Sequence, residues 1–333
     1  TLEKRNTRDF EVTLYSYGHD DHTAMQHRVR AACEHFVDMR AMGPREMAER
    51  IRADGIDVLV ELKGHTQGSR LAVLAYRAAP VQVSWLGFPG TTGMHCIDYF
   101  IGDPVATPLS HAAHYTECLA QLPHSYQPND SQRPRPAPSQ RMQWGLPKQA
   151  LVLGCFNQSF KLTPQTFDAW MRILRAVPNA VLWLLNDNPL ATANLRREAQ
   201  QRGVDPERLI FAAKVSVGEH LARLPLADLM LDNWPCNAHT TASDALWMGV
   251  PLATVIGDSF ASRVAASLLH AVELDSLVYE NVAQYEAGVI HLLRHPEKLR
   301  ALREHLDHGR SVFPLFDGSR CAQDVEALYR RMV

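Results

Sequence analysis

Short apolar runs separated by longer polar or amphipathic segments recur along most of the chain. Runs that are rich in β-branched and aromatic residues and bounded by turn residues predict strands at 11–17, 57–62, 81–85, 151–156, 181–185, 209–212 and 229–231. Helices are predicted after Pro44 and after Thr163, because proline suits the first helical turn and threonine caps it. This alternation predicts an α/β protein with parallel sheets covered by helices.

The C-terminal part of the chain is predicted to be helical, because its apolar residues recur at helical spacing. The predicted helices cover 281–293, 296–308 and 318–331. Val325, Leu328 and Tyr329 mark the apolar side of the last one. In enzymes with paired domains, such a terminal helix often packs back across the interface.

A change in composition divides the chain into two parts. Between 125 and 147 the residues are mainly Pro, Gln, Ser and Arg, and four prolines leave little room for a regular element: Pro128, Pro134, Pro136 and Pro138. A chain of 333 residues also exceeds what one hydrophobic core usually serves. We therefore predict a first α/β domain at 1–124, a linker at 125–147 and a second α/β domain with terminal helices at 148–333.

Charge and composition narrow the range of partners. The chain has 34 Lys and Arg against 36 Asp and Glu, a net charge of -2, which does not favour nucleic acid as a main partner. No run approaches the roughly 20 apolar residues of a membrane helix, and the start of the chain lacks the apolar core of a signal peptide. The six cysteines are scattered without a CxxC pair. We expect a cytoplasmic protein with no membrane partner, no disulfide and no bound metal.

The segment 232–244 leads from a predicted strand into a predicted helix, which is where open parallel sheets bind ligands. Thr240 and Thr241 can present unpaired amides and hydroxyls to a diphosphate, because a helix start favours anions. Asp244, one turn further, can accept a hydrogen bond from a ribose hydroxyl. On spacing alone, a simple helix cap at Thr240 with a packing role for His239 is an equally good interpretation.

The segment 154–161 follows the first strand of the second domain. Lys161 supplies a compact positive charge for a leaving phosphate, and Gln158 offers both a donor and an acceptor. A solvated loop lysine is the commoner role for such a residue. His220 and Arg223 are three residues apart and share one face if 217–224 is helical, where they can flank a nucleobase, although spacing alone favours a solvated face.

Two glycine-containing loops follow strands in the first domain. Glycine allows close approach of the backbone, so the loop at 85–93, with Leu86, Gly87 and Pro89, and the loop at 64–70, with Thr66, can line a sugar pocket. Each loop taken alone is equally compatible with a tight turn.

Together, four segments resemble glycosyltransferase family 41, the O-linked N-acetylglucosamine transferases: 85–91, 156–161, 236–244 and 261–267. The resemblance extends from about Phe10 to the C-terminus. It implies a GT-B fold of two Rossmann-like domains and a metal-independent, inverting transfer from UDP-N-acetylglucosamine to protein Ser or Thr hydroxyls, with no cofactor besides the donor.

The resemblance also implies roles for individual residues. Lys161 is expected to act in catalysis and to hold the diphosphate together with the helix start at Thr240 and Thr241. Contacts are also implied for Gln158 and His239 at the diphosphate, Asp244 at the ribose, His220 and Arg223 at the uracil, and Leu86, Gly87 and Pro89 at the sugar.

The chain departs from the family pattern in three ways. It is expected to begin at the second strand of the first domain, after the loop that carries the family's histidine, and it contains no tetratricopeptide repeats or inserted domain. Val217 stands where animal members carry a lysine, for which Lys214 is a substitute. Three alternatives stay open: transfer of glucose, including to asparagine; a UDP-binding module without transfer; and, ranked last, a sugar-nucleotide epimerase.

Overall fold

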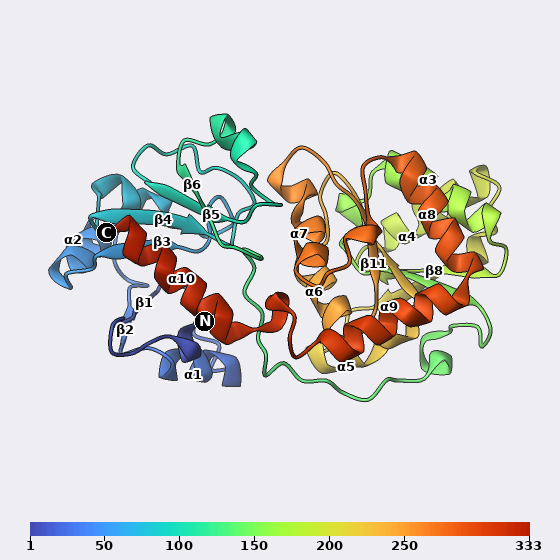
Figure 1. Cartoon of the computed structure of the whole chain (residues 1–333), viewed down its shortest axis with the longest axis horizontal. Coiled ribbons are helices and arrows are strands. Elements are labelled where there is room, and N and C mark those ends of the chain that lie inside the picture. The colour runs from blue at the N-terminus through green and yellow to red at the C-terminus, as the bar shows by residue number, and fades with distance from the viewer. The chain divides into compact units, whose positions relative to one another are not determined.

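The computed structural model describes residues Thr1–Val333, which divide into two compact units. The first unit consists of Thr1–Asn129 together with Asp317–Val333, and the second consists of Asp130–Phe316. Each unit is built of parallel strands and helices (Figure 1). No helix of the structure is long and apolar enough to cross a membrane.

The first unit contains two parallel sheets. Four strands pair in chain order: β3 (Val58–Glu61), β4 (Val81–Trp85), β5 (Tyr99–Gly102) and β6 (Cys118–Gln121). A separate pair is formed by β1 (Thr13–Ser16) and β2 (His35–Asp38). The helices are α1 (Ala24–Ala31), α2 (Pro44–Ala53) and α10 (Gly318–Met332), with short 3-10 turns η1 (Leu2–Lys4), η2 (Leu71–Tyr76) and η3 (Leu109–His114).

Helix α2 illustrates how local sequence produces the first unit's packing. Pro44 occupies its first turn, and the Glu46 carboxylate accepts a hydrogen bond of 2.8 Å from the Gly43 amide. The helix buries one face in an apolar cluster made of Val37, Met39, Met47, Ala48, Ile51, Val73 and Ala78.

The C-terminal helix α10 belongs to the first unit, so the structure groups residues differently from the expected 148–333 domain. Its apolar side, which includes Val325, Leu328 and Met332, packs in a cluster with Val83 of β4 and Ile101 of β5 (Figure 1). The physical reason is that an amphipathic helix is stable where its apolar side is covered, and here the first unit's sheet covers it.

The second unit is a six-stranded parallel sheet in the order β9-β8-β7-β10-β11-β12. Its strands are β7 (Leu151–Cys155), β8 (Ala180–Asn186), β9 (Leu209–Ala213), β10 (Leu229–Leu231), β11 (Leu252–Val255) and β12 (Val278–Tyr279). Counted from the first strand of the unit, this is the order 3-2-1-4-5-6 of a doubly wound Rossmann sheet. The chain adds β8 and β9 on one side of β7 and adds β10 to β12 on the other side, so the strand order reverses between β7 and β10.

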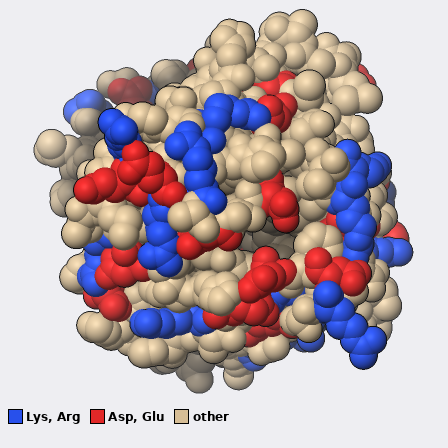
Figure 2. Space-filling view, turned by 90° about the vertical axis from the view of Figure 1, so that its left-hand side faces the viewer, with Lys and Arg blue, Asp and Glu red and all other residues tan.

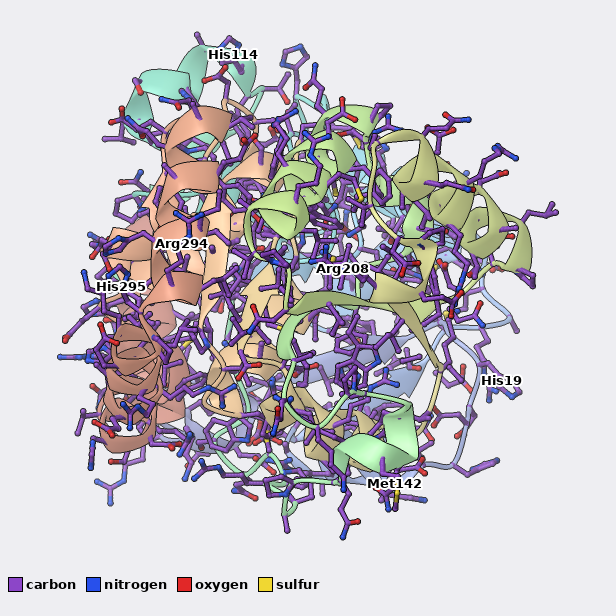
Figure 3. The ribbon with its side chains drawn as sticks, turned by 90° about the vertical axis from the view of Figure 1, so that its right-hand side faces the viewer. His19, His114, Met142, Arg208, Arg294 and His295 are labelled. Carbon is purple, nitrogen blue, oxygen red and sulfur yellow. The ribbon has the colours of Figure 1, made fainter.

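Seven helices accompany this sheet: α3 (Pro164–Ala176), α4 (Pro189–Gln201), α5 (Val217–Arg223), α6 (Thr240–Trp247), α7 (Val264–His270), α8 (Val282–Arg294) and α9 (Pro296–Gly309). The Thr163 hydroxyl caps α3 by accepting from the Thr166 amide, as predicted. Arg208, labelled in Figure 3, donates to the carbonyls of Val177 and Ala180 at 2.8 and 2.9 Å. It thereby satisfies backbone oxygens at the turn between α3 and β8.

The predicted linker contains one short 3-10 turn, η4 (Arg141–Trp144), and no longer element. Met142 of this turn lies at the surface and is 80% exposed (Figure 3). From Asp130 onward the segment belongs to the second unit. The Ser139 amide, for example, donates a 2.9 Å hydrogen bond to the carbonyl of Ala222 in α5.

Candidate functional site

The strand order of the second unit places two candidate segments side by side. β7 pairs with β10, and the chain continues from these strands to opposite halves of the sheet. The loops that follow their carboxyl ends, 156–161 and 232–239, therefore meet at the reversal point, where doubly wound sheets bind ligands. Sequence patterns identified both loops, but only the strand order brings them together.

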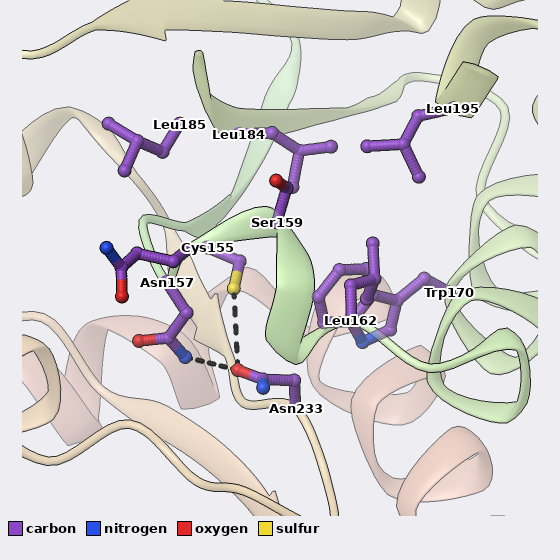
Figure 4. Close-up of a pocket in the computed structure, with 10 residues that line it drawn as sticks. Cys155, Asn157, Ser159, Leu162, Trp170, Leu184, Leu185, Leu195 and Asn233 are labelled. Carbon is purple, nitrogen blue, oxygen red and sulfur yellow. Dashed lines mark hydrogen bonds between the residues drawn. The ribbon is translucent and has the colours of Figure 1, made fainter. Parts of the chain in front are cut away.

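Hydrogen bonds join the two loops directly. Thr241 Oγ1 donates to Asn157 Oδ1 at 2.7 Å, and Asn157 Nδ2 donates to Asn233 Oδ1 (Figure 4). Asn233 Nδ2 in turn donates to the carbonyls of Cys236 at 2.8 Å and Lys161 at 3.2 Å. Asn157 and Asn233 thus hold the start of α6 against the loop that carries Lys161. Sequence reasoning assigned neither asparagine a role.

Lys161 is the last residue of the 3-10 turn η5 (Ser159–Lys161) and is half-buried. Its positive charge acts on two buried groups of the neighbouring loop, His239 and Asp232. The fully solvated loop lysine considered above is therefore not what the structure contains. Lys161 thus places a positive charge in the loop after β7, at the point where the strand order reverses.

His239 immediately precedes α6 and stays neutral at physiological pH. Burial, together with the nearby charge of Lys161, lowers the pKa of His239 to about 4. Its Nε2 atom is buried and has no hydrogen-bond partner in the chain. The amides of Thr240 and Thr241 follow at once, and the first helical hydrogen bonds to the His239 carbonyl come from residues after them. Unpaired amides beside a lysine are suited to an anion.

Asp232 fixes the loop that leads from β10 to α6. It is fully buried and accepts hydrogen bonds from Thr254 Oγ1 at 2.6 Å and from the amides of Asn233 and Ala238 at 2.9 and 2.7 Å. Burial raises the pKa of Asp232 to about 7, against the effect of these hydrogen bonds and of Lys161. Its position directly after a buried strand is the sequence signal that could have identified it.

His220 and Arg223 lie together on α5 and are not on a solvated face, which corrects the interpretation favoured by spacing alone. Arg223 is only 2% exposed, and its guanidinium donates to His220 Nδ1 at 3.0 and 3.2 Å. It also lies 4.5 Å from the ring centre of Phe156 and 5.1 Å from that of Trp144. Burial and the Arg223 charge lower the pKa of His220 to about 4, so the imidazole is a neutral acceptor.

Gln158 is exposed and is one of the residues that line a pocket beside the loop after β7 (Figure 4). Polar groups of both loops, including Asn157 and Asn233, line one side, and leucines of β8 line the other. The full lining consists of Cys155, Asn157, Gln158, Ser159, Leu162, Trp170, Leu184, Leu185, Leu195 and Asn233.

Asp244 lies one turn into α6 and forms an ion pair with Arg133 of the predicted linker. Both side chains are mostly buried, with 16% of Asp244 and 17% of Arg133 exposed. Burial raises the pKa of Asp244, and the Arg133 guanidinium opposes that shift. No sequence pattern indicated a role for Arg133, which is 111 residues away from its partner.

The remaining predicted residues, Thr66, Leu86, Gly87 and Pro89, lie in the first unit. A Cβ atom added at Gly87 would lie 2.1 Å from the Leu62 carbonyl oxygen, so the loops after β3 and β4 touch through their backbones. His65 Nε2 and the Thr92 carbonyl, 2.7 Å apart, join the same two loops. The structure thus brings these two predicted loops together.

Comparisons with known proteins agree with this architecture. A family model for glycosyl transferase family 41 matches residues 2–136 and 135–325. A probable UDP-N-acetylglucosamine–peptide N-acetylglucosaminyltransferase, SEC of Arabidopsis thaliana, is 38% identical over 98% of this chain and 34% of its own length. The UDP-N-acetylglucosamine–peptide N-acetylglucosaminyltransferase of Caenorhabditis elegans is 28% identical over 97% of this chain and 38% of its own length.

Solved structures give the same result. A mutant O-GlcNAc transferase of Thermobaculum terrenum matches 99% of this chain and 63% of its own chain, with a TM-score of 0.92 and 34% identity. A sucrose-phosphate synthase of Thermosynechococcus elongatus, 13% identical with a TM-score of 0.62, shares the fold alone. The predicted α/β fold of GT-B type is confirmed. The chain spans about a third of the length of the curated relatives it matches.

Proposed function

The chain belongs to glycosyltransferase family 41, and from this premise we propose that it transfers N-acetylglucosamine from UDP-N-acetylglucosamine to Ser or Thr hydroxyls of proteins. The names of the Arabidopsis and Caenorhabditis relatives supply the donor and the peptide acceptor. The observation that carries the proposal is the convergence of Lys161, neutral His239 and the start of α6 at the reversal point of the second sheet.

The UDP moiety would be held by groups that the second unit already places together. The amides and hydroxyls of Thr240 and Thr241, with Lys161 and Gln158, would take the diphosphate. Asp244 would accept a hydrogen bond from a ribose hydroxyl. His220 and Arg223 would lie by the uracil, where Arg223, itself buried among aromatic rings, would hold the His220 imidazole through Nδ1. Thr66, Leu86, Gly87 and Pro89 of the first unit would shape the sugar pocket.

Catalysis in this proposal is electrostatic. Negative charge develops on the departing UDP as the glycosidic bond breaks, and Lys161 and the helix start would stabilise it. His239, kept neutral by its low pKa, would lie beside the diphosphate without adding charge to the site. The reaction would be inverting and would need neither a metal nor a cofactor, since no carboxylate pair of DxD type follows a strand in the sequence.

Composition and surface charge support the proposed partners and location. Ion pairs along α2, such as Arg45–Glu49 and Arg50–Asp54, mix both signs of charge, and basic and acidic side chains also intermingle across the face in Figure 2. This mixture supports a protein acceptor over nucleic acid. All six cysteines are free thiols, which supports a cytoplasmic location.

The direct test offers a Ser- and Thr-rich peptide library with either UDP-N-acetylglucosamine or UDP-glucose and identifies the product by mass spectrometry. The proposal expects a mass increase of one N-acetylhexosamine on Ser or Thr. Hexose addition, or addition to asparagine, would favour the glucosyltransferase alternative. UDP binding without any product would favour a binding module.

A further inference from the structure

Within the second unit, the segment 130–147 contacts two of the side chains proposed to bind the nucleoside. Arg133 forms an ion pair with Asp244, the proposed ribose ligand. Eleven residues further on, the Trp144 ring lies 5.1 Å from the guanidinium of Arg223, one of the residues proposed to flank the uracil. This connecting segment is thus in contact with the nucleoside site.

The Arg133–Asp244 pair is the least exposed of the three ion pairs of this segment, since the Arg141–Asp228 pair is 25% and 28% exposed. Arg133 and Asp244 are 17% and 16% exposed, whereas Arg135 and its partner Asp307 are 46% and 50% exposed. An exposed pair contributes little because water and salt screen it. Removal of one member of a shielded pair leaves the other charge without compensation. Arg133 is therefore the group that compensates the negative charge of the Asp244 carboxylate.

One carboxylate oxygen of Asp244 is available to accept a hydrogen bond from a ligand. Oδ1 is held by Arg133, and Oδ2 makes no hydrogen bond within the chain. A carboxylate that is held at one oxygen can still accept a hydrogen bond from a hydroxyl at the other. Burial raises the pKa of Asp244 and Arg133 opposes the rise, which favours the ionised carboxylate. An ionised acceptor forms the stronger hydrogen bond with a hydroxyl.

We propose that Arg133 is a positioning residue of the nucleoside site, which fixes the Asp244 carboxylate for contact with the ribose. The inference rests on the proposed function, because it takes Asp244 as the ribose ligand. It adds that the segment 130–147 contributes to the nucleotide site of the second unit.

The test measures binding of UDP and of 2′,3′-dideoxy-UDP, which lacks both ribose hydroxyls, by calorimetry on the 333-residue chain. Arg133→Met should weaken UDP binding about tenfold and leave dideoxy-UDP binding within about twofold, so that the preference for UDP disappears. In an Asp244→Ala background the same change should have less than about a twofold effect. Arg133→Lys, which keeps the charge and a donor, should retain most of the preference.

Arg135→Met is the matched control and should leave the affinity for both ligands unchanged. Equal weakening of both ligands by Arg133→Met would indicate a structural role only and would overturn the inference. Unchanged or tighter UDP binding by Arg133→Met, with weaker binding by Asp244→Ala, would overturn it while leaving the ribose assignment intact. Unchanged UDP binding by Asp244→Ala would overturn the ribose assignment itself. Should Arg133→Met fail to fold, the preference retained by Arg133→Lys decides the question: complete loss of it contradicts positioning by charge.

Discussion

Thr241 Oγ1 donates a hydrogen bond of 2.7 Å to Asn157 Oδ1 and so joins the start of α6 to the loop after β7. Asn157 Nδ2 in turn donates a hydrogen bond to Asn233 Oδ1 in the loop after β10. Because the three residues come from three different segments, this chain of hydrogen bonds sets the position of the helix start relative to Lys161. A diphosphate site at this point depends on that geometry.

Thr241→Val tests this connection, because it removes the hydroxyl while keeping the shape of the side chain. We expect UDP affinity to fall about five- to tenfold, since Asn157 Oδ1 loses its partner and the helix start is no longer held. Calorimetry measures the change. Thr192→Val, which removes an exposed hydroxyl bonded to Asn186, is the control and should bind UDP normally. Wild-type affinity in Thr241→Val would exclude the hydroxyl from the site.

Lys161→Ala should act on the rate more than on donor binding. We expect kcat to fall about 100-fold or more with a smaller change in KM, because leaving-group charge is largest in the transition state. Steady-state kinetics on the full-length protein measures both values, and Lys148→Ala, at an exposed lysine, is the control. A kcat within about threefold of wild type, below about 1 kcal/mol, would leave the helix start as the main stabiliser of the phosphate.

Gly87→Ala should disturb the sugar loop. The added Cβ would lie 2.1 Å from the Leu62 carbonyl oxygen and 2.7 Å from the Lys63 Cα, so one of the two loops must move. We expect loss of most transfer activity and a destabilisation of about 1–3 kcal/mol in thermal unfolding. At Gly90 the nearest atom, a Phe88 ring carbon, would be 3.5 Å away. Gly90→Ala should therefore behave like wild type, and equal effects of the two changes would contradict the close approach.

His220 should make stability depend on pH. Its folded pKa of about 4 lies below the usual value near 6.5, so the unfolded chain takes up the proton first as pH falls. The stabilisation is complete above about pH 6.5 and is lost between pH 6.5 and 4. Between pH 7.5 and pH 5, protonation of this histidine in the unfolded chain should lower the free energy of unfolding by about 2 kcal/mol.

Urea unfolding of His220→Asn at both pH values measures this contribution. Asparagine keeps an acceptor for Arg223 but does not titrate, so the difference between the two urea midpoints should shrink relative to wild type. His27→Asn, in an exposed position, is the control. An undiminished difference would mean that His220 is not the group that titrates.

Metal independence predicts that a chelator has no effect. UDP affinity and transfer rate should be the same with EDTA as with added Mg²⁺, because the proposed site neutralises the diphosphate with Lys161 and helix amides. A large loss of affinity on adding EDTA, restored by excess Mg²⁺, would show that a cation bridges the phosphates.

Local periodicity determined many elements of this protein. The predicted strands at 81–85 and 229–231 are β4 and β10, and the predicted helices at 296–308 and 318–331 differ from α9 and α10 by one residue. These elements carry a clear apolar pattern, and the two helices begin with a proline or after a capping aspartate. The strands β5, β6 and β12 were not predicted, although β10, a fully apolar run of three residues, was.

Tertiary structure decided which of these elements meet. The sequence singled out Lys161 and Thr241, but their proximity depends on the pairing of β7 with β10. It likewise could not show that Arg223 is buried among aromatic rings or that Arg133 reaches Asp244. The physical reason is that periodicity records only which side of an element is apolar. The partner of a buried charge is selected by strand order and by chain crossings between residues far apart in sequence.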